Sequence, residues 1–332
     1  MPEDIAVRVP QEAMRGTVED IFQALGMPKA DARQAADVLI WADLRGCESH
    51  GVSNMMRPYV AWLRSGAINP KPEWRISRDS RAVVTIDCDK GLGLVVGPRA
   101  MDVAIERARD YGVATVVADN GGHYGAAGYH AYMALEHDMI GLSMTAGGLG
   151  VTPTWGAEAM VGLNPIGFAA PAGEEPPFVF DASMSSVAGN KLQLARRLGV
   201  PTFPAWIATM DGAPVMEQSP IPAEFLILPV GGTREIGSHK GYGLALMVEV
   251  LTSLISGGHG GPFRSRPLAH YFQAYNVDAF TDVAEFKARM DASTSAPSGT
   301  APRRLVTTAW STQVSWRTRR SRRVWCGASR TT

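Results

Sequence analysis

The sequence predicts an α/β protein with a mixed sheet at its core and a helical N-terminal region. Three observations support this prediction. Segments with strand-like alternation follow segments with helical periodicity through most of the chain. Hydrophobic residues make up 45% of the 332 residues and charged residues 19%, which is typical of a well-buried globular protein. Unbroken apolar stretches all fall short of the roughly 18 residues that a membrane span requires, so no membrane association is expected.

Residues 1–75 are predicted to form the helical N-terminal region. Residues 18–26 and 30–45 have the pattern of two helices, separated by the helix-breaking sequence GMPK. The second of these carries alanine, leucine and isoleucine at roughly helical spacing, which gives it an apolar face. Pro70 and Pro72 end the region.

Residues 76–291 are predicted to form the α/β core. A strand over 82–88, a helix over 98–112 and a strand over 113–119 come first, followed by a helix over 124–138 and a strand over 139–146. Later strands are expected at 166–171, 177–183 and 224–230. A last clear helix is expected over 241–256, where apolar side chains starting at Leu244 recur at i+3, i+4, i+7, i+10 and i+11.

Charge and cysteine content exclude several classes of protein. The formal net charge is +0, so no global field attracts nucleic acid, a membrane surface or acidic partners, and a small molecule is the expected ligand. Cys47, Cys88 and Cys326 are odd in number and far apart, and no CxxC motif occurs. Neither a disulfide framework nor a thiolate zinc site is therefore predicted, and a reducing cytoplasm is the expected location.

Residues 292–332 form an atypical tail. After Asp291 the chain contains no Asp, Glu or Lys, while arginines accumulate among serines and threonines. Three interpretations stand: a basic tail for nucleic acid, a disordered appendage, or a frameshift in the coding sequence. The neutral body and the lack of a stacking pattern among the tail's aromatics disfavour the first. Resequencing the locus would test the frameshift.

The usual sequence signatures of nucleotide enzymes are missing. No GxGxxG motif follows a strand, because the glycines of GLGLVVG have the wrong spacing, and no GxxxxGK[ST] motif occurs. A Rossmann site and a P-loop are therefore disfavoured. This absence does not exclude a nucleotide bound in another way.

Two segments place histidine where it could do chemistry. In GCESHGVSNMMRPY, Ser49 and His50 are followed by a glycine, with Arg57 seven residues beyond; this is either an active-site turn or the polar end of a helix. In NGGHYGAAGYH, His123 lies just after a strand and before a helix, where open α/β sheets bind ligands. A capping loop with a surface histidine is the alternative reading of this second segment.

Three histidines in and after this segment do not form a metal site. His123, His130 and His137 are spaced by seven residues, which corresponds to about 10.5 Å along a helix. Imidazoles on one zinc must each lie about 2.0–2.1 Å from it, so these three cannot converge on one ion. No metal site is predicted.

Two further segments suggest anion or sugar binding. Asp181 ends a strand and is followed by Ala182, Ser183 and Ser185; its carboxylate suits a ribose hydroxyl or an imidazole, or caps the next helix. In GSHKGYGLALMVEVL, His239 and Lys240 stand at the start of a helix. A lysine there opposes the helix dipole, which suggests a phosphate or carboxylate partner, although a solvated lysine is the alternative.

Five segments in order resemble the malate/L-lactate dehydrogenase family, which is distinct from the Rossmann-type lactate and malate dehydrogenases. They are ADLRGCESHGV, GHYGAAGY, GLNPIGFAAP, FDASMSSVA and HKGYGLALMVEVL, and the resemblance runs over residues 18–291. Each segment alone is weak, but five in this order are specific.

The resemblance implies an NAD- or NADP-dependent oxidoreductase with a non-Rossmann nicotinamide-binding fold, expected to be a homodimer. Family substrates are small 2-oxo or 2-hydroxy acids and cyclic imino acids. The resemblance places the acid/base histidine at His50 or His123, with Ser49 as a substrate contact. It places cofactor contacts in the segment of Asp181, Ala182, Ser183 and Ser185 and at His239 and Lys240. A catalytically impaired or non-catalytic binding protein with the same fold is the alternative function.

The chain departs from the family pattern at two points. Several members carry an arginine four residues after the SHG histidine, where this chain has Asn54. Asparagine can hydrogen-bond a carboxylate but cannot pair its charge, so either Arg57 has taken that role or the substrate differs. The second departure is the tail, which replaces a family segment that contributes to the cofactor site; weaker cofactor binding is the expected consequence.

Overall fold

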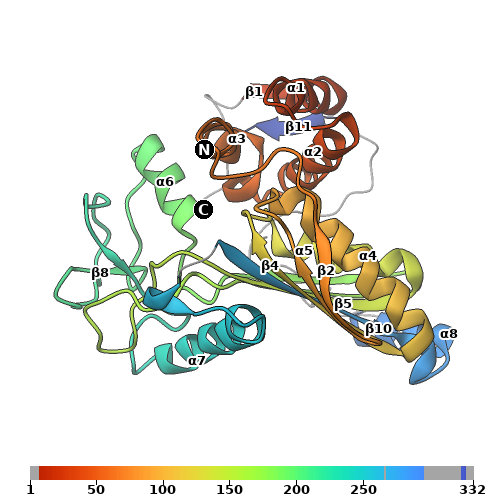
Figure 1. The fold of residues 1–332 in the computed structure, drawn as a ribbon. Helices are drawn as coiled ribbons and strands as arrows, with labels where there is room; N and C mark the ends of the chain where they lie inside the picture. Colours follow the sequence, from red (N-terminus) through yellow and green to blue (C-terminus); the bar gives the residue numbers. More distant parts are fainter. Residues whose placement is uncertain (1–6, 265–266, 295–322, 327–332) are drawn as a thin grey trace.

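A computed structural model describes residues 7–264, 267–294 and 323–326, and its centre is a seven-stranded sheet (Figure 1). The strand order is β2-β3-β4-β10-β5-β6-β7. In this sheet β3 and β4 pair in parallel and every other neighbouring pair is antiparallel, which confirms the predicted mixed sheet. The strands are β2 (Arg75–Ser80), β3 (Val83–Asp87), β4 (Val113–Gly121), β5 (Met139–Ala146), β6 (Ile166–Ala170), β7 (Phe178–Ala182) and β10 (Leu268–Asn276).

Strand direction brings several carboxyl ends to one end of the sheet. Because β10 is antiparallel to both β4 and β5, those two strands run the same way. The antiparallel steps through β6 give β7 that direction as well. The chain segments that follow β3, β4, β5 and β7 therefore leave the same end of the sheet.

Helices α4 (Gly93–Tyr111) and α5 (Ala127–Met133) cover one face of the sheet (Figure 1). Helix α4 begins five residues before Pro98, where the sequence placed its start, and includes that proline in its second turn. The predicted helix over 124–138 is shorter, because it begins at Ala127 and its last part is a 3-10 turn (Ala134–His137). The core between this layer and the sheet contains Ile86, Met101, Val116 and Phe272.

The N-terminal helices form a further layer beyond α4 and α5. They are α1 (Gln11–Ala24), α2 (Lys29–Leu44) and α3 (Val52–Arg64), with a 3-10 turn, η2 (Glu48–His50), between the last two. Phe22, Leu39, Tyr59 and Leu94 belong to the apolar cluster that joins this layer to α4. The short strand β1 (Val7–Pro10) pairs with β11 (Arg323–Cys326).

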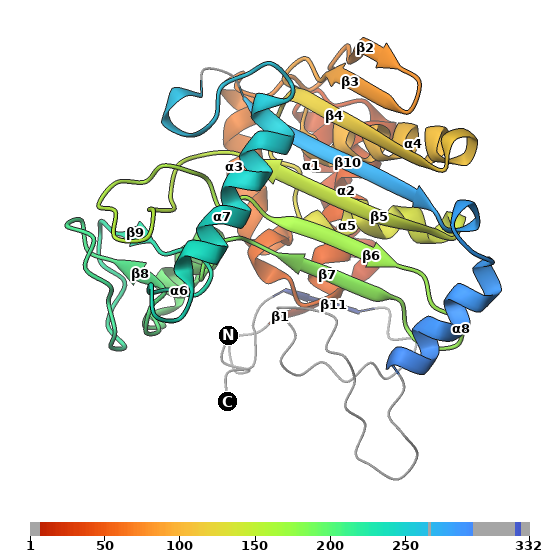
Figure 2. The same cartoon turned by 90° about the horizontal axis from the view of Figure 1, so that it is seen from below.

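The opposite face of the sheet is crossed by α7 (Ser238–Glu249), which continues as a π-helical turn (Val250–Leu254) (Figure 2). Beside it lie α6 (Gly189–Leu198) and the two-residue strands β8 (Ile207–Ala208) and β9 (Leu226–Ile227), so the strand expected over 224–230 is much shorter than predicted. Short 3-10 turns (Gly261–Phe263 and Val277–Ala279) and α8 (Val283–Thr294) complete the description.

The interpretations of the tail concern residues that lie mainly outside the described part of the chain. Within 292–332 the structure describes the last three residues of α8 and the strand β11. Among the described residues, no helix is long and apolar enough to cross a membrane, and no group of three or more His, Cys, Asp or Glu side chains is arranged to hold a metal ion.

Candidate functional site

The Asp43 side chain holds the turn that carries Ser49 and His50. This side chain is 3% exposed, and its carboxylate accepts a hydrogen bond from the Val52 N–H at 2.9 Å, at the start of α3. A Cβ atom on Gly51 would lie 1.7 Å from Asp43 Oδ1, so the turn requires glycine. Burial raises the pKa of Asp43 to about 7, although the Val52 N–H acts in the opposite direction. The SHG segment is thus a turn between α2 and α3 whose conformation is set by specific contacts with Asp43.

The loop that carries His123 begins at an irregularity in β4. The register between β10 and β4 shifts before Gly121, and Asn120 there has a φ of 59°. A Cβ on Gly121 would lie 2.8 Å from His270 Nε2, and one on Gly122 would lie 3.2 Å from a backbone carbonyl oxygen. The two glycines therefore permit the close packing that places His123 beyond the carboxyl end of β4.

These two segments bring His50 and His123 together. Their rings are stacked, with centroids 5.7 Å apart and planes inclined by 9°. Ser49 Oγ lies 2.9 Å from His50 Nδ1. The Tyr59 hydroxyl lies 2.8 Å from His123 Nδ1, and the Gly125 N–H donates to the same nitrogen at 3.3 Å. Because a backbone N–H can only donate, His123 Nδ1 is an acceptor, and the neutral ring carries its proton on Nε2.

Both histidines are neutral in the free protein at neutral pH. Burial lowers the pKa of His50 to about 4. Burial also lowers the pKa of His123 to about 3, with further contributions from His50, His270 and His130. In the described part of the chain, neither ring's Nε2 makes a hydrogen bond to protein. Each ring therefore offers one polar nitrogen to a ligand.

Asn54 and Arg57 lie in different environments on α3, the first buried and the second exposed. Asn54 is buried, and its Nδ2 group donates to the carbonyl oxygens of Ser49 at 3.1 Å and Asn190 at 3.3 Å. The amide thus supports the backbone of the histidine turn. Arg57 is exposed on α3 and makes no ion pair or hydrogen bond with the rest of the described chain.

Asp181 stands near the end of β7 and contacts α5. Its Oδ2 accepts the Gly128 N–H at 2.7 Å, in the first turn of α5. The helix that it caps therefore precedes it in the chain, whereas the sequence suggested the helix that follows. Burial raises the pKa of Asp181 to about 6, and the Gly128 N–H opposes the shift.

A cleft of about 380 Å³ opens directly after β7. Ala182, Ser183 and Ser185, three of the predicted cofactor contacts, line it. Trp206 and the Gly231-Gly232 turn line it as well, together with Ser186, Pro204, Ala205, Val230 and Ile236. His239 and Lys240 are exposed in the first turn of α7, shortly after Ile236.

Helix α6 connects this cleft to the histidine turn. The carbonyl oxygen of Asn190 receives the Asn54 amide, and the next residue, Lys191, places its Nζ 5.2 Å from the centre of the Trp206 ring. The Glu48 charge raises the pKa of Lys191, but burial lowers it by more.

Three residues of this site were not predicted from the sequence: Lys191, Tyr59 and Asp43. Only Tyr59 carried a signal, because it lies four residues after Met55 on the apolar face of a helix.

Comparisons with known proteins agree with this architecture. The sequence model of the family described as malate/L-lactate dehydrogenase matches residues 9–323. A malate dehydrogenase of Pyrococcus horikoshii is 39% identical over 86% of this chain and 80% of its own length. An L-sulfolactate dehydrogenase of Methanocaldococcus jannaschii is 36% identical over 82% of this chain and 78% of its own.

A solved structure extends the agreement to the fold. The malate dehydrogenase of Entamoeba histolytica superimposes with a TM-score of 0.82 at 28% identity, covering 91% of this chain and 89% of that one. The family predicted from the five motifs is therefore confirmed by sequence and by structure. With these matches over most of its length, the chain belongs to the malate/L-lactate dehydrogenase family and is an oxidoreductase of the dehydrogenase type.

Proposed function

We propose that the protein transfers a hydride between a nicotinamide cofactor, NAD or NADP, and a small 2-oxo or 2-hydroxy acid or a cyclic imino acid. The observation that carries the proposal is the stacked pair of neutral histidines, in which His123 has its proton directed to Nε2. The names of the two relatives, a malate and an L-sulfolactate dehydrogenase, support a small hydroxy acid.

In this proposal His123 transfers the proton. The nicotinamide, when bound, supplies or accepts the hydride. The reacting form of His123 is the imidazolium, whose Nδ1–H donates to the Tyr59 hydroxyl oxygen. In the reducing direction it gives its Nε2 proton to the substrate oxygen or nitrogen and becomes a neutral ring protonated at Nδ1; in the oxidising direction Nε2 of that neutral ring takes the proton back. A substrate carboxylate beside the ring favours the imidazolium, so its arrival raises the low pKa of His123 towards neutrality. His50, held by Ser49, hydrogen-bonds the substrate.

The cleft after β7 fits the polar part of such a cofactor. Its wall offers the hydroxyl groups of Ser183 and Ser185, which suit ribose and phosphate oxygens. His239 and Lys240 add basic side chains at a helix N-terminus, where phosphate groups bind favourably. Asp181 stands between this wall and α5, and we propose that its second carboxylate oxygen accepts a cofactor hydroxyl.

The function is tested directly by absorbance at 340 nm. Purified protein is mixed with NADH or NADPH and a panel of 2-oxo acids and cyclic imino acids. We expect turnover of about 1–10³ s⁻¹ with at least one pair, the usual range for enzymes. A folded protein that turns over none of them would support the alternative, a non-catalytic binding protein that retains the fold.

We propose Arg57 as the cation for the substrate carboxylate, because it is exposed and without an ion pair in the described chain. Arg57→Gln is expected to raise the KM of the acid about tenfold or more, since a charge-assisted hydrogen bond is lost, and to leave the KM of the cofactor unchanged. Arg33→Gln, on the neighbouring α2, is the matched control. Equal KM values for the acid in wild type and Arg57→Gln would assign the carboxylate to another residue.

We propose that the protein is a homodimer and that α7 forms the interface. Six apolar side chains of α7, its π-helical extension and the residue that follows it are 40–58% exposed: Leu244, Leu246, Met247, Val250, Leu254 and Ile255. Figure 2 shows this helix on the outside of the sheet, without a described element over it. An exposed apolar surface of this kind, gathered along one helix, marks an interaction site.

Light scattering during gel filtration tests the dimer. The wild type is expected at twice 35.6 kDa, and Leu246→Asp at 35.6 kDa, because a buried unpaired carboxylate disfavours association. Phe280→Asp, at an exposed apolar side chain elsewhere, should leave the mass unchanged. A wild type of 35.6 kDa contradicts the proposal.

Cys47 and Cys88 are free thiols, which supports the proposal of a reducing, cytoplasmic location. Fractionation of the native cells would test it; recovery outside the cytoplasmic fraction would contradict it.

A further inference from the structure

A stack of three buried rings lies behind His123. Tyr124 is sandwiched between His130, with ring centroids 4.5 Å apart, and His270, with centroids 4.9 Å apart and planes inclined by 7°. Each of the three side chains is at most 1% exposed. None of these rings is used by the proposed reaction, so two buried histidines are left without an assigned role.

The hydrogen bonds of His270 have a defined direction. Its Nε2 lies 3.1 Å from the Gly122 carbonyl oxygen, and its Nδ1 lies 2.8 Å from Thr145 Oγ1. A carbonyl oxygen can only accept, so Nε2 carries a proton. Burial lowers the pKa of His270 to about 3, with smaller contributions from His130 and Arg264, so the ring is neutral and Nδ1 is an acceptor. The Thr145 hydroxyl also lies 3.3 Å from the Ala269 carbonyl oxygen, but the shorter contact, with the unprotonated Nδ1, takes its proton. The chain of donors therefore runs from Thr145 through His270 to the Gly122 carbonyl.

This chain ends at the peptide unit that immediately precedes His123. The Gly122 N–H donates to the Gly91 carbonyl at 2.8 Å, and the Gly122 carbonyl receives His270. The residue before His123 is thus held by both of its backbone polar groups. Since the Gly122–His123 peptide plane sets the direction in which His123 leaves the backbone, a change at His270 is transmitted to the imidazole.

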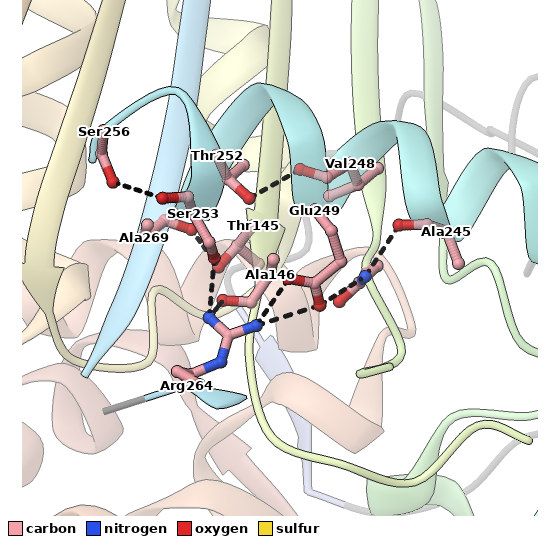
Figure 3. Close-up of polar contacts among 11 residues, drawn as sticks. Thr145, Ala146, Ala245, Val248, Glu249, Thr252, Ser253, Ser256, Arg264 and Ala269 are labelled. Carbon is pink, nitrogen blue, oxygen red and sulfur yellow. Dashed lines mark hydrogen bonds and ion pairs between the residues drawn. The ribbon is translucent and has the colours of Figure 1, made fainter. Parts of the chain in front are cut away.

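Thr145 is itself held in place at the carboxyl end of β5. Arg264 Nη1 donates to the carbonyl oxygen of Ala146 at 3.0 Å (Figure 3). The other end of the guanidinium forms a bidentate pair with Glu249 of α7, at 2.9 and 2.8 Å, and the Glu249 side chain is 4% exposed. This buried ion pair fixes the strand end from which the Thr145 hydroxyl reaches His270.

We propose that His270, oriented by Thr145, is a positioning residue that sets the direction of the His123 imidazole through the Gly122 carbonyl. The proposal rests on the proposed function of His123 as the proton donor. In this proposal β10 and β5 orient the catalytic group through His270 and Thr145, although neither strand contributes a side chain to the histidine pair.

The first test replaces His270 by phenylalanine, which retains the ring stack and removes both hydrogen bonds. The kcat is expected to fall about 10- to 100-fold, in the range found when groups that orient a reactive ligand are removed, with the KM of the cofactor unchanged. His270→Gln can again donate to the Gly122 carbonyl and is expected to recover part of the loss. Thr145→Val reports on the same chain from its other end, in case His270→Phe does not fold. His137→Gln, on the outer 3-10 turn, is the control.

A double-mutant cycle separates this role from a general loss of stability. In the His123→Asn background, His270→Phe is expected to change the residual kcat less than twofold, because the group that it orients is already absent. The same 10- to 100-fold loss in both backgrounds would overturn the proposal.

A second readout separates failure of this inference from failure of the proposed function. If His123→Asn keeps full activity, the proposed role of His123 as proton donor fails, but ¹⁵N NMR of the imidazoles still tests the positioning. The wild type should show His123 as one Nε2–H tautomer, and His270→Phe or Thr145→Val should shift its nitrogen signals or mix the tautomers. Unchanged His123 signals in both variants would overturn the inference.

Discussion

Replacing His123 by asparagine is expected to lower kcat about a thousandfold, because general acid-base catalysis by a positioned side chain contributes typically 10²–10⁴-fold. Asparagine occupies the place of Nδ1 and can still meet the Tyr59 hydroxyl and the Gly125 N–H, so the loop should keep its shape. What it lacks is Nε2, the atom that is free to face a substrate. The measurement is steady-state kinetics at 340 nm with the best cofactor and substrate pair, together with circular dichroism of both proteins.

His50→Asn is the informative companion variant. If His50 binds the substrate and does not transfer the proton, its loss should raise the KM of the acid and lower kcat much less than the loss of His123. The opposite pattern, with kcat retained in His123→Asn and lost in His50→Asn, would exchange the two roles. Retention in both variants would remove the histidine pair from the reaction.

For the two histidines, the sequence predicts each candidate segment but not the contact between them. Each segment was identifiable as a candidate, since His123 follows a strand and His50 lies in a turn between helices. Their contact depends on the N-terminal helical layer packing over α4 and α5, which brings η2 to the end of β4. Local periodicity contains no information about that packing, and the resemblance to a family supplied it instead.

Other parts of the site depend on partners that are distant in the chain. Asn54 is predicted to contact the substrate, and in the structure its Nδ2 group donates to the carbonyl oxygens of Ser49 and of Asn190, the second of them on α6; the substrate contact stays a prediction. Asp181 is predicted to serve a cofactor or to cap the following helix; one of its oxygens caps α5, which precedes it, and the cofactor contact stays a prediction. In both cases the residue type correctly indicated a hydrogen-bonding role, while its partner was set by the tertiary fold.

The spacing of residues could also mislead. The seven-residue spacing of His123, His130 and His137 suggested one helix face, but α5 begins only at Ala127, so His123 lies before it. His130 is buried in the ring stack, whereas His137 contacts Arg109 at the surface. The apolar stripe of the last predicted helix was real, yet several of its side chains face outwards. An apolar stripe predicts that a helix face packs against something, but it does not reveal whether that partner is the sheet of the same chain or a second subunit.

Acid is expected to destabilise the protein steeply between about pH 6.5 and 4, because four histidines are held in their neutral form, His130 and His270 fully buried and His50 and His123 half-buried. The pKa values of His50 and His130 are lowered to about 4 and those of His123 and His270 to about 3, chiefly by burial. In this window the unfolded chain binds protons at these positions and the folded chain does not. The stability that these groups contribute is therefore present above pH 6.5 and is lost as the pH falls.

The two carboxyls with the large upward pKa shifts, buried Asp43 and half-buried Asp181, act in the opposite sense. The pKa of Asp43 is raised to about 7 and that of Asp181 to about 6, so the folded chain holds protons there that the unfolded chain has released. Their contribution is present at low pH and is lost as the pH rises. Four groups against two leave a net difference of about two protons, which corresponds to about 2.7 kcal/mol per pH unit, at 1.36 kcal/mol for each.

Urea unfolding followed by tryptophan fluorescence, at pH 5.0, 5.5, 6.0 and 6.5 and one protein concentration, measures this slope. His130→Gln removes one of the four histidines without touching the histidine pair, so the slope should fall by about 1.4 kcal/mol per pH unit. Asp43→Asn removes an opposing carboxyl and should make the slope steeper by a similar amount. A free energy of unfolding that stays constant from pH 6.5 to 5.0, or a His130→Gln slope equal to that of the wild type, would show that the buried imidazoles accept protons without unfolding. Such a result would also undermine the tautomer assigned to His123, because that assignment requires rings that stay neutral in the folded protein.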